Sequence, residues 1–174
     1  MNIYQTVPVR ATTDVTLRLV SPDDAEYLTT VYSDPQAVAL MNDDNCDFGF
    51  YMPSRQQMET TIAYWLDHYR QRNFVRFTVV SNVTAHAVGT IEGFGGDTGV
   101  LRIDLAPAWE QPDIIGQLLD YAVSTFRSYF GNVRLVTKAR PGASARRLAL
   151  RDHGWTSIGA YRGYADYYAI SLER

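Results

Sequence analysis

Apolar and polar positions follow two different periods along the chain, and the most informative change of period lies between Leu101 and Phe130. From Leu101 to Leu105 apolar and polar residues alternate, which is typical of a strand with one buried face. Pro107 and Pro112 interrupt the alternation. Helical spacing then predicts an amphipathic helix with buried positions Ile114, Ile115, Leu118, Leu119, Ala122, Val123, Phe126 and Phe130. The start of a helix after such a loop has unpaired N–H groups that suit an anion.

Two earlier helices are predicted from their capping residues. Ser21 and Pro22 begin the first, which ends near Pro35. Ser54 begins the second, and Gln57 completes a capping box three residues later. Residues 42–52 follow neither period, so we predict a loop there.

The remaining pattern predicts a mixed, mostly antiparallel sheet flanked by helices. A last helix over 143–152 ends with Gly154 as its C-terminal cap. The strands are expected at 16–20, 74–81, 87–94, 101–105, 133–139, 157–160 and 166–172. This order indicates one α/β domain over residues 1–174, with its core at about 16–172. Because Pro107 interrupts the exit from the fourth strand, we expect the sheet to splay between the strand ending at Leu105 and the strand near Val133.

Composition narrows the function classes. Hydrophobic residues make up 46% and charged residues 20% of the 174 residues, as in globular proteins. The net charge of −3 lacks a concentrated basic tract, so we expect no nucleic-acid partner. No apolar run approaches the roughly 20 residues that span a bilayer, so we expect no membrane span. The single Cys46 is typical of a protein in the reducing cytoplasm. The sequence does not decide between a monomer and a homodimer.

The order of elements and two phrases carry a family resemblance. TLRLVSPDDAEYLTTVYSDP at 16–35 and GYADYYAISL at 163–172 are similar to opening and closing phrases of the GCN5-related N-acetyltransferase (GNAT) family. The resemblance covers nearly the whole chain and is nearest to the ribosomal-protein alanine acetyltransferase-like branch. It implies an enzyme that moves an acetyl group from acetyl-coenzyme A to a primary amine of a small molecule or a protein N-terminus.

The phosphate-binding motif of that family, Q/R-x-x-G-x-G/A, is altered here. Alignment on Pro107 places Glu110 at the basic or amide position, while Asp113 and Ile115 replace the small residues. Pro112 donates no N–H, and the two carboxylates repel phosphate. The resemblance nevertheless implies contacts of acetyl-coenzyme A with Leu105, Ala106, Ile114, Ile115, Gly116, Arg146 and Arg147. The arginines equally suit a solvated helix face.

Catalysis would need a base for the amine and a donor for the leaving thiolate. Asp104 and Glu92 are the candidate bases, and each could instead be a solvated or salt-bridged strand carboxylate. The tyrosine that family members often use as the acid is matched by Leu150. The scattered histidines show no metal spacing, so no metal is expected. Acidic and aromatic residues that would suit a cationic amine gather at Asp43, Asp44, Asp47, Phe48, Phe50 and Tyr51.

Two functions therefore remain open. The first is an acyl-coenzyme A-dependent N-acyltransferase with an altered phosphate loop. The second is a binding or interaction module of the same fold that has lost the coenzyme. The family resemblance favours the enzyme, whereas the altered loop favours the module.

Overall fold

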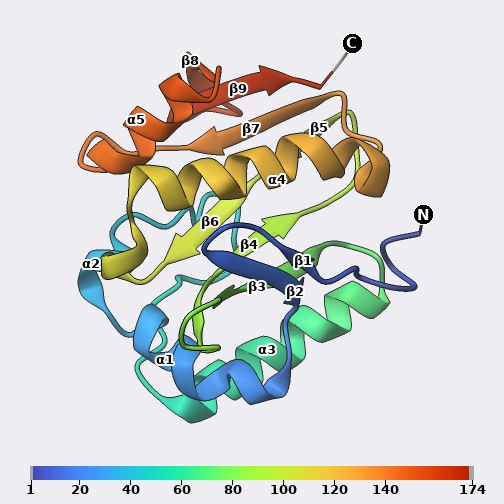
Figure 1. Ribbon diagram of the computed structural model, residues 1–174, viewed down its shortest axis with the longest axis vertical. Coiled ribbons are helices and arrows are strands. Elements are labelled where there is room, and N and C mark those ends of the chain that lie inside the picture. The colour runs from blue at the N-terminus through green and yellow to red at the C-terminus, as the bar shows by residue number, and fades with distance from the viewer. Residues whose placement is uncertain (1, 173–174) are drawn as a thin grey trace.

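A computed structural model describes residues 2–172 of the chain (Figure 1). The helices are α1 (Ala25–Tyr32), α2 (Pro35–Val38), α3 (Arg55–Arg70), α4 (Pro112–Phe130) and α5 (Ser144–Asp152), with short 3₁₀ turns at Pro22–Asp24 and Pro107–Trp109. The strands are β1 (Arg10–Ala11), β2 (Val15–Leu19), β3 (Val75–Ser81), β4 (Ala87–Gly93), β5 (Thr98–Val100), β6 (Arg102–Leu105), β7 (Arg134–Lys138), β8 (Thr156–Tyr161) and β9 (Tyr164–Ser171).

The capping residues begin the helices as predicted. The Ser21 side chain caps the 3₁₀ turn that leads into α1, and Asp24 completes that capping box. Ser54 and Gln57 form the expected capping box of α3. The long helix α4 begins two residues earlier than the apolar stripe indicated, at Pro112, whose missing N–H costs nothing in the first turn.

The strands form two sheets that separate along one line. The five-stranded sheet has the order β1-β2-β3-β4-β6, and the four-stranded sheet has the order β5-β7-β9-β8. The parallel register of β5 with β7 ends at Val100 and Val136, after which β6 pairs only with β4. The predicted splay between the strand ending at Leu105 and the strand near Val133 is confirmed (Figure 1).

Two short strands were not predicted. β1 has two residues and β5 has three, so neither is long enough to show a period. The hydrogen bonds of β5 are made to β7, which lies more than thirty residues later in the sequence. Tertiary pairing, rather than local pattern, therefore defines this strand.

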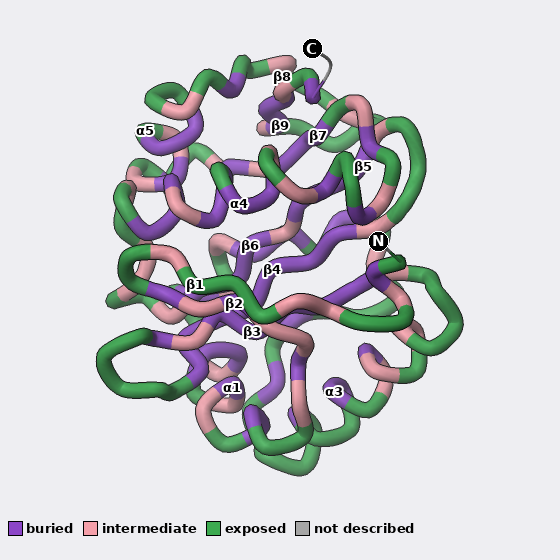
Figure 2. The backbone as a smooth tube through the Cα atoms, turned by 45° about the vertical axis from the view of Figure 1, so that its right-hand side comes forward, coloured by how far each residue is buried: buried purple, intermediate pink, exposed green. Residues whose placement is uncertain are grey.

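Each face of the five-stranded sheet packs against different helices. Apolar residues of β2, β3, β4 and β6 pack against α4, whereas α1 and α3 form a second core on the opposite face. Buried residues therefore continue through the sheet from one helical layer to the other (Figure 2). Strand alternation places Arg76, Thr78, Thr90, Glu92 and Asp104 on the face toward α1 and α3, where all five are buried.

Within residues 2–172, every helix is too short or too polar to cross a membrane.

Candidate active site

The Leu105 backbone lies where the two sheets separate. Ala106 N–H donates to the Val88 carbonyl, so residues 102, 104 and 106 are the hydrogen-bonded positions facing β4. The Leu105 N–H therefore faces the opposite edge, toward β7. Gly89 lies opposite Leu105, and a Cβ there would come within 2.1 Å of the Asp104 carbonyl, so only glycine permits this close approach. Of the two amides predicted for the site, Leu105 is free of the β4 ladder and Ala106 is not.

A small cavity opens beside Leu105, and we call it the donor-side cavity. It lies among α2, the end of β6 and the start of α5. Its lining residues include Leu40, Leu105, Pro107, Glu110, Ala143 and Ser144.

Glu110, which lines this cavity, forms an ion pair with Arg146. Arg146 donates from Nε and from Nη2 to the two carboxylate oxygens of Glu110, at 2.9 and 2.8 Å. It also donates to the Leu40 carbonyl at 3.1 Å. The Glu110 side chain is only 9% exposed, and the Arg146 side chain is 2% exposed. The guanidinium expected to contact coenzyme phosphates is thus already occupied by the carboxylate expected to repel them.

The first turn of α4 contains the other residues predicted to contact the coenzyme. Ile114 and Ile115 are buried in the main core, and the Ile115 N–H donates to the Gln111 carbonyl. Gly116 faces α5, where a Cβ would lie 2.4 Å from the His153 ring, so this glycine permits close helix packing. Since Pro112 has no N–H, the turn keeps the Asp113 and Ile114 amides as donors for an anion.

Arg147 and Arg140 are also engaged by the protein. Arg147 Nε donates to the Tyr168 hydroxyl at 3.1 Å. Arg140 donates to the Asp43 carboxylate and to the Met41 carbonyl. Arg140, Arg146 and Arg147 therefore bind neighbouring segments of the chain.

Residues 40–44, which we call the strap, cross from the donor side to the opposite side of the splayed sheet. Arg102 of β6 donates to the Asn42 and Asp44 carbonyls. Lys138, the last residue of β7, binds both carboxylate oxygens of Asp44 at 2.9 and 2.8 Å. Side chains from both sheets thus hold the strap across the splay.

Tyr167 of β9 completes this attachment. Its hydroxyl donates to the Asp44 carboxylate at 3.0 Å and accepts from the Asn42 amide. Burial raises the pKa of Tyr167 to about 12, so the hydroxyl stays protonated at neutral pH.

A buried charge network lies next to the strap. Arg76 donates to Glu92 at 2.6 Å and to Asp104 at 2.9 Å, and its guanidinium carbon lies 4.4 Å from the Trp65 ring centroid. Tyr32 donates to the same Asp104 oxygen, Oδ2, at 2.6 Å. The buried Asp104 Oδ1 has no partner in residues 2–172. Burial raises the pKa of Asp104, although the nearby Arg76 lowers it.

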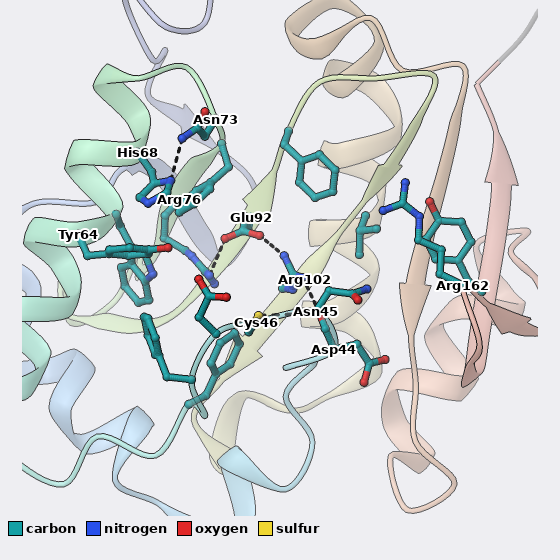
Figure 3. A pocket seen from close by; sticks show the side chains of 18 of the residues that line it. Asp44, Asn45, Cys46, Tyr64, His68, Asn73, Arg76, Glu92, Arg102 and Arg162 are labelled. Carbon is teal, nitrogen blue, oxygen red and sulfur yellow. Dashed lines mark hydrogen bonds and ion pairs between the residues drawn. The ribbon is translucent and has the colours of Figure 1, made fainter.

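Glu92 occupies a different environment from Asp104. One carboxylate oxygen accepts from Arg76 and the other from Arg102 (Figure 3). Both candidate bases are therefore ion-paired, and Asp104 alone retains an oxygen with no partner in the described residues.

A larger cavity, the acceptor-side cavity, lies on the other side of the strap. Its volume is about 390 Å³, which is within the usual range for small-molecule sites. Tyr64 and His68 of α3 form one wall, the Glu92–Arg102 pair lies at its base, and Arg162 stands on the opposite side (Figure 3). Aromatic residues dominate the remainder of the lining: Phe48, Phe50, Trp65, Phe74, Phe94, Tyr161 and Tyr167.

The acidic residues suggested for a cationic amine separate into two groups. Asp43 and Asp44 are paired with Arg140 and Lys138 and hold the strap. Asp47 has no ion pair in the described chain and lines the acceptor-side cavity with Phe48. Tyr51 lines a neighbouring groove instead.

No protein-family model matches the chain, and no curated protein matches it. Solved structures do match over almost its whole length. Mycobacterium smegmatis RimJ in complex with CoA-disulfide superposes with a TM-score of 0.72 at 15% identity, covering 94% of this chain and 85% of that one. The chain has the GNAT fold.

Two other GNAT-fold structures agree. The putative ribosomal-protein-serine acetyltransferase from Vibrio cholerae gives a TM-score of 0.70 at 15% identity, covering 98% of this chain and 99% of that one. The GNAT-family acetyltransferase from Bacillus anthracis gives 0.68 at 15% identity, covering 96% and 100%. The fold expected from the order of elements is confirmed, and at these identities the likeness concerns the fold alone.

Sequence reasoning missed several residues that form this GNAT-fold site: Arg76, Lys138, Tyr167 and Arg162. Arg76 gave a usable signal, because a charged residue inside the apolar run FVRFTVV needs a buried partner. Lys138 and Tyr167 gave none, since their partner Asp44 lies about a hundred residues away. Among residues 2–172 there is no cluster of His, Cys, Asp and Glu that could hold a metal.

Proposed function

We propose that this chain is an N-acetyltransferase that transfers the acetyl group of acetyl-coenzyme A to a primary amine. The observation that carries the proposal is the Leu105 N–H, which faces the splay on a residue that lines the donor-side cavity. An amide fixed there donates to the acetyl carbonyl and stabilises the negative charge that grows on its oxygen during attack. RimJ, which superposes on this chain, is described in complex with CoA-disulfide, which supports the choice of donor.

The acceptor amine approaches from the acceptor-side cavity. The two cavities lie at opposite ends of the strap, because Leu40 borders one and Asp44 borders the other. An acetyl group held beside Leu105 therefore lies between the coenzyme on one side and the amine on the other. Transfer forms the amide C–N bond and breaks the thioester C–S bond; the amine loses one proton and the leaving thiolate gains one.

Asp104 is the residue we propose as the base. Its Oδ1 has no partner in the described chain, while Tyr32 and Arg76 fix Oδ2. Because Asp104 does not line either cavity, this role requires a water molecule to relay the proton. Glu92 lines the acceptor-side cavity, but its carboxylate is divided between two arginines, so we assign it a role in holding Arg102.

The donor side fits coenzyme phosphates only in part. The Asp113 and Ile114 amides at the start of α4 suit an anion, whereas the adjacent Glu110 carboxylate opposes one. For Arg146 to bind phosphate, its pair with Glu110 must open. We therefore expect weaker binding of acetyl-coenzyme A than in a protein with an intact glycine loop.

The test combines binding and turnover. Calorimetry with acetyl-coenzyme A and with free coenzyme A should show binding, and mass spectrometry should show a gain of one acetyl group on amines from a panel of small molecules and N-terminal peptides. Absence of both binding and acetyl transfer would contradict the proposal and leave the interaction-module function. Binding without transfer to any amine would assign the site to the coenzyme but not to this reaction.

A further inference from the structure

Three acidic and three arginine side chains line the acceptor-side cavity, and four of these six form ion pairs. Glu92 is paired with Arg76 and Arg102, and Asp44 is paired with Lys138, which approaches from β7. Two charged side chains remain. Asp47 and Arg162 line the cavity and form no ion pair anywhere in residues 2–172. These two charges are the ones that a ligand in the cavity can satisfy.

Asp47 and Arg162 belong to opposite walls. Asp47 lies on the α3 side, because the ring of the next residue, Phe48, packs 5.5 Å from the Tyr64 ring, centroid to centroid. Arg162 occupies the turn between β8 and β9. Figure 3 shows Tyr64 and Arg162 on opposite sides of the cavity, with the Glu92–Arg102 pair between them. The rim is therefore negative on the α3 side and positive on the hairpin side.

Arg162 is held in an unusual backbone conformation. Its φ is +51° and that of Gly163 is +85°, as in the two-residue turns that favour Asn-Gly or Gly-Gly. A left-handed conformation at a residue with a Cβ costs about 1–2 kcal/mol. The two-residue turn between Tyr161 and Tyr164 requires this conformation, so the hairpin fixes the backbone at Arg162.

The Arg162 side chain extends from the turn toward the cavity (Figure 3). Its guanidinium carbon lies 5.3 Å from the centroid of the Tyr161 ring, which supports one face of the group. The N–H edge has no carboxylate partner in the described chain. A planar fork of donors with one face on an aromatic ring is the geometry that binds a carboxylate through two parallel hydrogen bonds.

We propose that Arg162 is a specificity-determining residue that binds a carboxylate of the acceptor, so that the amines acetylated by this protein carry a carboxylate close to the reacting nitrogen. This proposal rests on the acetyltransferase function proposed above. Asp47 repels an anion from the α3 wall, so the acceptor carboxylate is directed to the hairpin side. The carboxylate can belong to a free amino acid or to an acidic side chain of a peptide.

The experiment compares amine substrates that differ in one group only. One pair is a tetrapeptide amide with glutamate or glutamine at its second position; the other is a dipeptide as free acid or as amide. The protein should prefer the carboxylate member of at least one pair by about tenfold in kcat/KM. The pair that shows the preference identifies whether a side-chain or a terminal carboxylate is bound.

Arg162→Gln should abolish this preference, because KM should rise about tenfold more for the carboxylate member than for the neutral member. Arg162→Lys should keep part of it, since lysine has the charge without the fork. The matched control is Arg72→Gln, because Arg72 is also exposed at positive φ, +63°, but lies outside the cavity. Thermal melting of each variant checks that the turn still folds.

The outcomes separate this proposal from the proposed function. If neutral and carboxylate amines are acetylated equally, or if Arg162→Gln keeps the preference, the specificity proposal is wrong and the acetyltransferase function stands. If no amine is acetylated by the unaltered protein, the proposed function fails and the specificity proposal fails with it.

Discussion

The donor-side and acceptor-side cavities lie at the two ends of the strap, and they differ in whether their charged side chains are ion-paired. On the donor side, Glu110 and Arg146 satisfy each other and are almost fully buried. On the acceptor side, the buried charges at the base are also paired. Asp47 and Arg162 at the rim have no ion-pair partner in the described chain. Paired buried charges fix the shape of a site, whereas an unpaired charge at its rim selects what binds.

The difference explains how this GNAT fold accommodates an almost fully buried carboxylate at position 110. A carboxylate at position 110 would be costly if it were buried alone. Arg146 removes that cost and ties α5 to the loop before α4 and, through the Leu40 carbonyl, to the strap. The pair therefore fixes the Arg146 guanidinium on the protein itself.

The largest expected effect comes from breaking the paired charges at the base of the acceptor side. Arg76→Met leaves Glu92 with one arginine and Asp104 with none, and should lower the free energy of unfolding by about 3–5 kcal/mol. Arg55→Met, which breaks an exposed pair with Glu59, should cost less than about 0.5 kcal/mol. Urea unfolding of both variants measures the contrast, and a similar loss in the two would show that the buried network is not a stabilising element.

Removal of the proposed base comes next. Asp104→Asn should lower kcat on an amine by about 10²–10⁴-fold while the affinity for acetyl-coenzyme A changes little. Glu92→Gln is the comparison, since its carboxylate lines the cavity but both of its oxygens are bound by arginines. A larger loss of kcat in Glu92→Gln than in Asp104→Asn would reverse the assignment.

The pH dependence of turnover tests the same residue. Burial raises the pKa of Asp104, so its charged form, the one that accepts a proton, is lost as pH falls through that raised value. The unaltered protein should therefore lose kcat on the acidic side at a higher pH than an ordinary aspartate would give. In Asp104→Asn this acidic limb should disappear, and a profile that keeps it would point to another base.

Breaking the Glu110–Arg146 pair should have a moderate effect on the affinity for acetyl-coenzyme A. Glu110→Gln removes a negative charge and releases Arg146 for a phosphate, so acetyl-coenzyme A should bind about tenfold more tightly by calorimetry. The same variant should melt at a lower temperature when free, because Arg146 loses its partner, and should recover when the coenzyme is added. Weaker binding in Glu110→Gln would show that the coenzyme does not approach this loop.

The smallest effect on acetyl-coenzyme A affinity is expected from a substitution at Asp113. This residue lies in the first turn of α4 near the surface, where solvent screens its charge. Asp113→Asn, which keeps the backbone conformation, should tighten acetyl-coenzyme A about two- to threefold, less than Glu110→Gln. An Asp113 effect larger than the Glu110 effect would mean that the phosphates lie nearer the helix than the alignment on Pro107 implies.

The helices and most strands could be predicted because their signals are local. Ser21, Ser54 and Gln57 begin helices through contacts three residues away, and the stripe from Ile114 identifies the buried face of α4. Part of the candidate site could also be predicted: Glu92 and Asp104 from their place on the strands, and Leu105 and Arg146 from the family resemblance. The strap and its partners could not, because their hydrogen bonds join residues about a hundred positions apart.

The backbone amide of Leu105 offers the most direct test that acetyl transfer occurs at the splay. Its proton exchange with solvent and its chemical shift can be followed by NMR as acetyl-coenzyme A is added, with Ala106 as the internal reference because its N–H already donates to Val88. We predict slower exchange and a changed shift at Leu105, with little change at Ala106. Saturation with acetyl-coenzyme A that leaves Leu105 unchanged, or no binding at all, would contradict this account of the site.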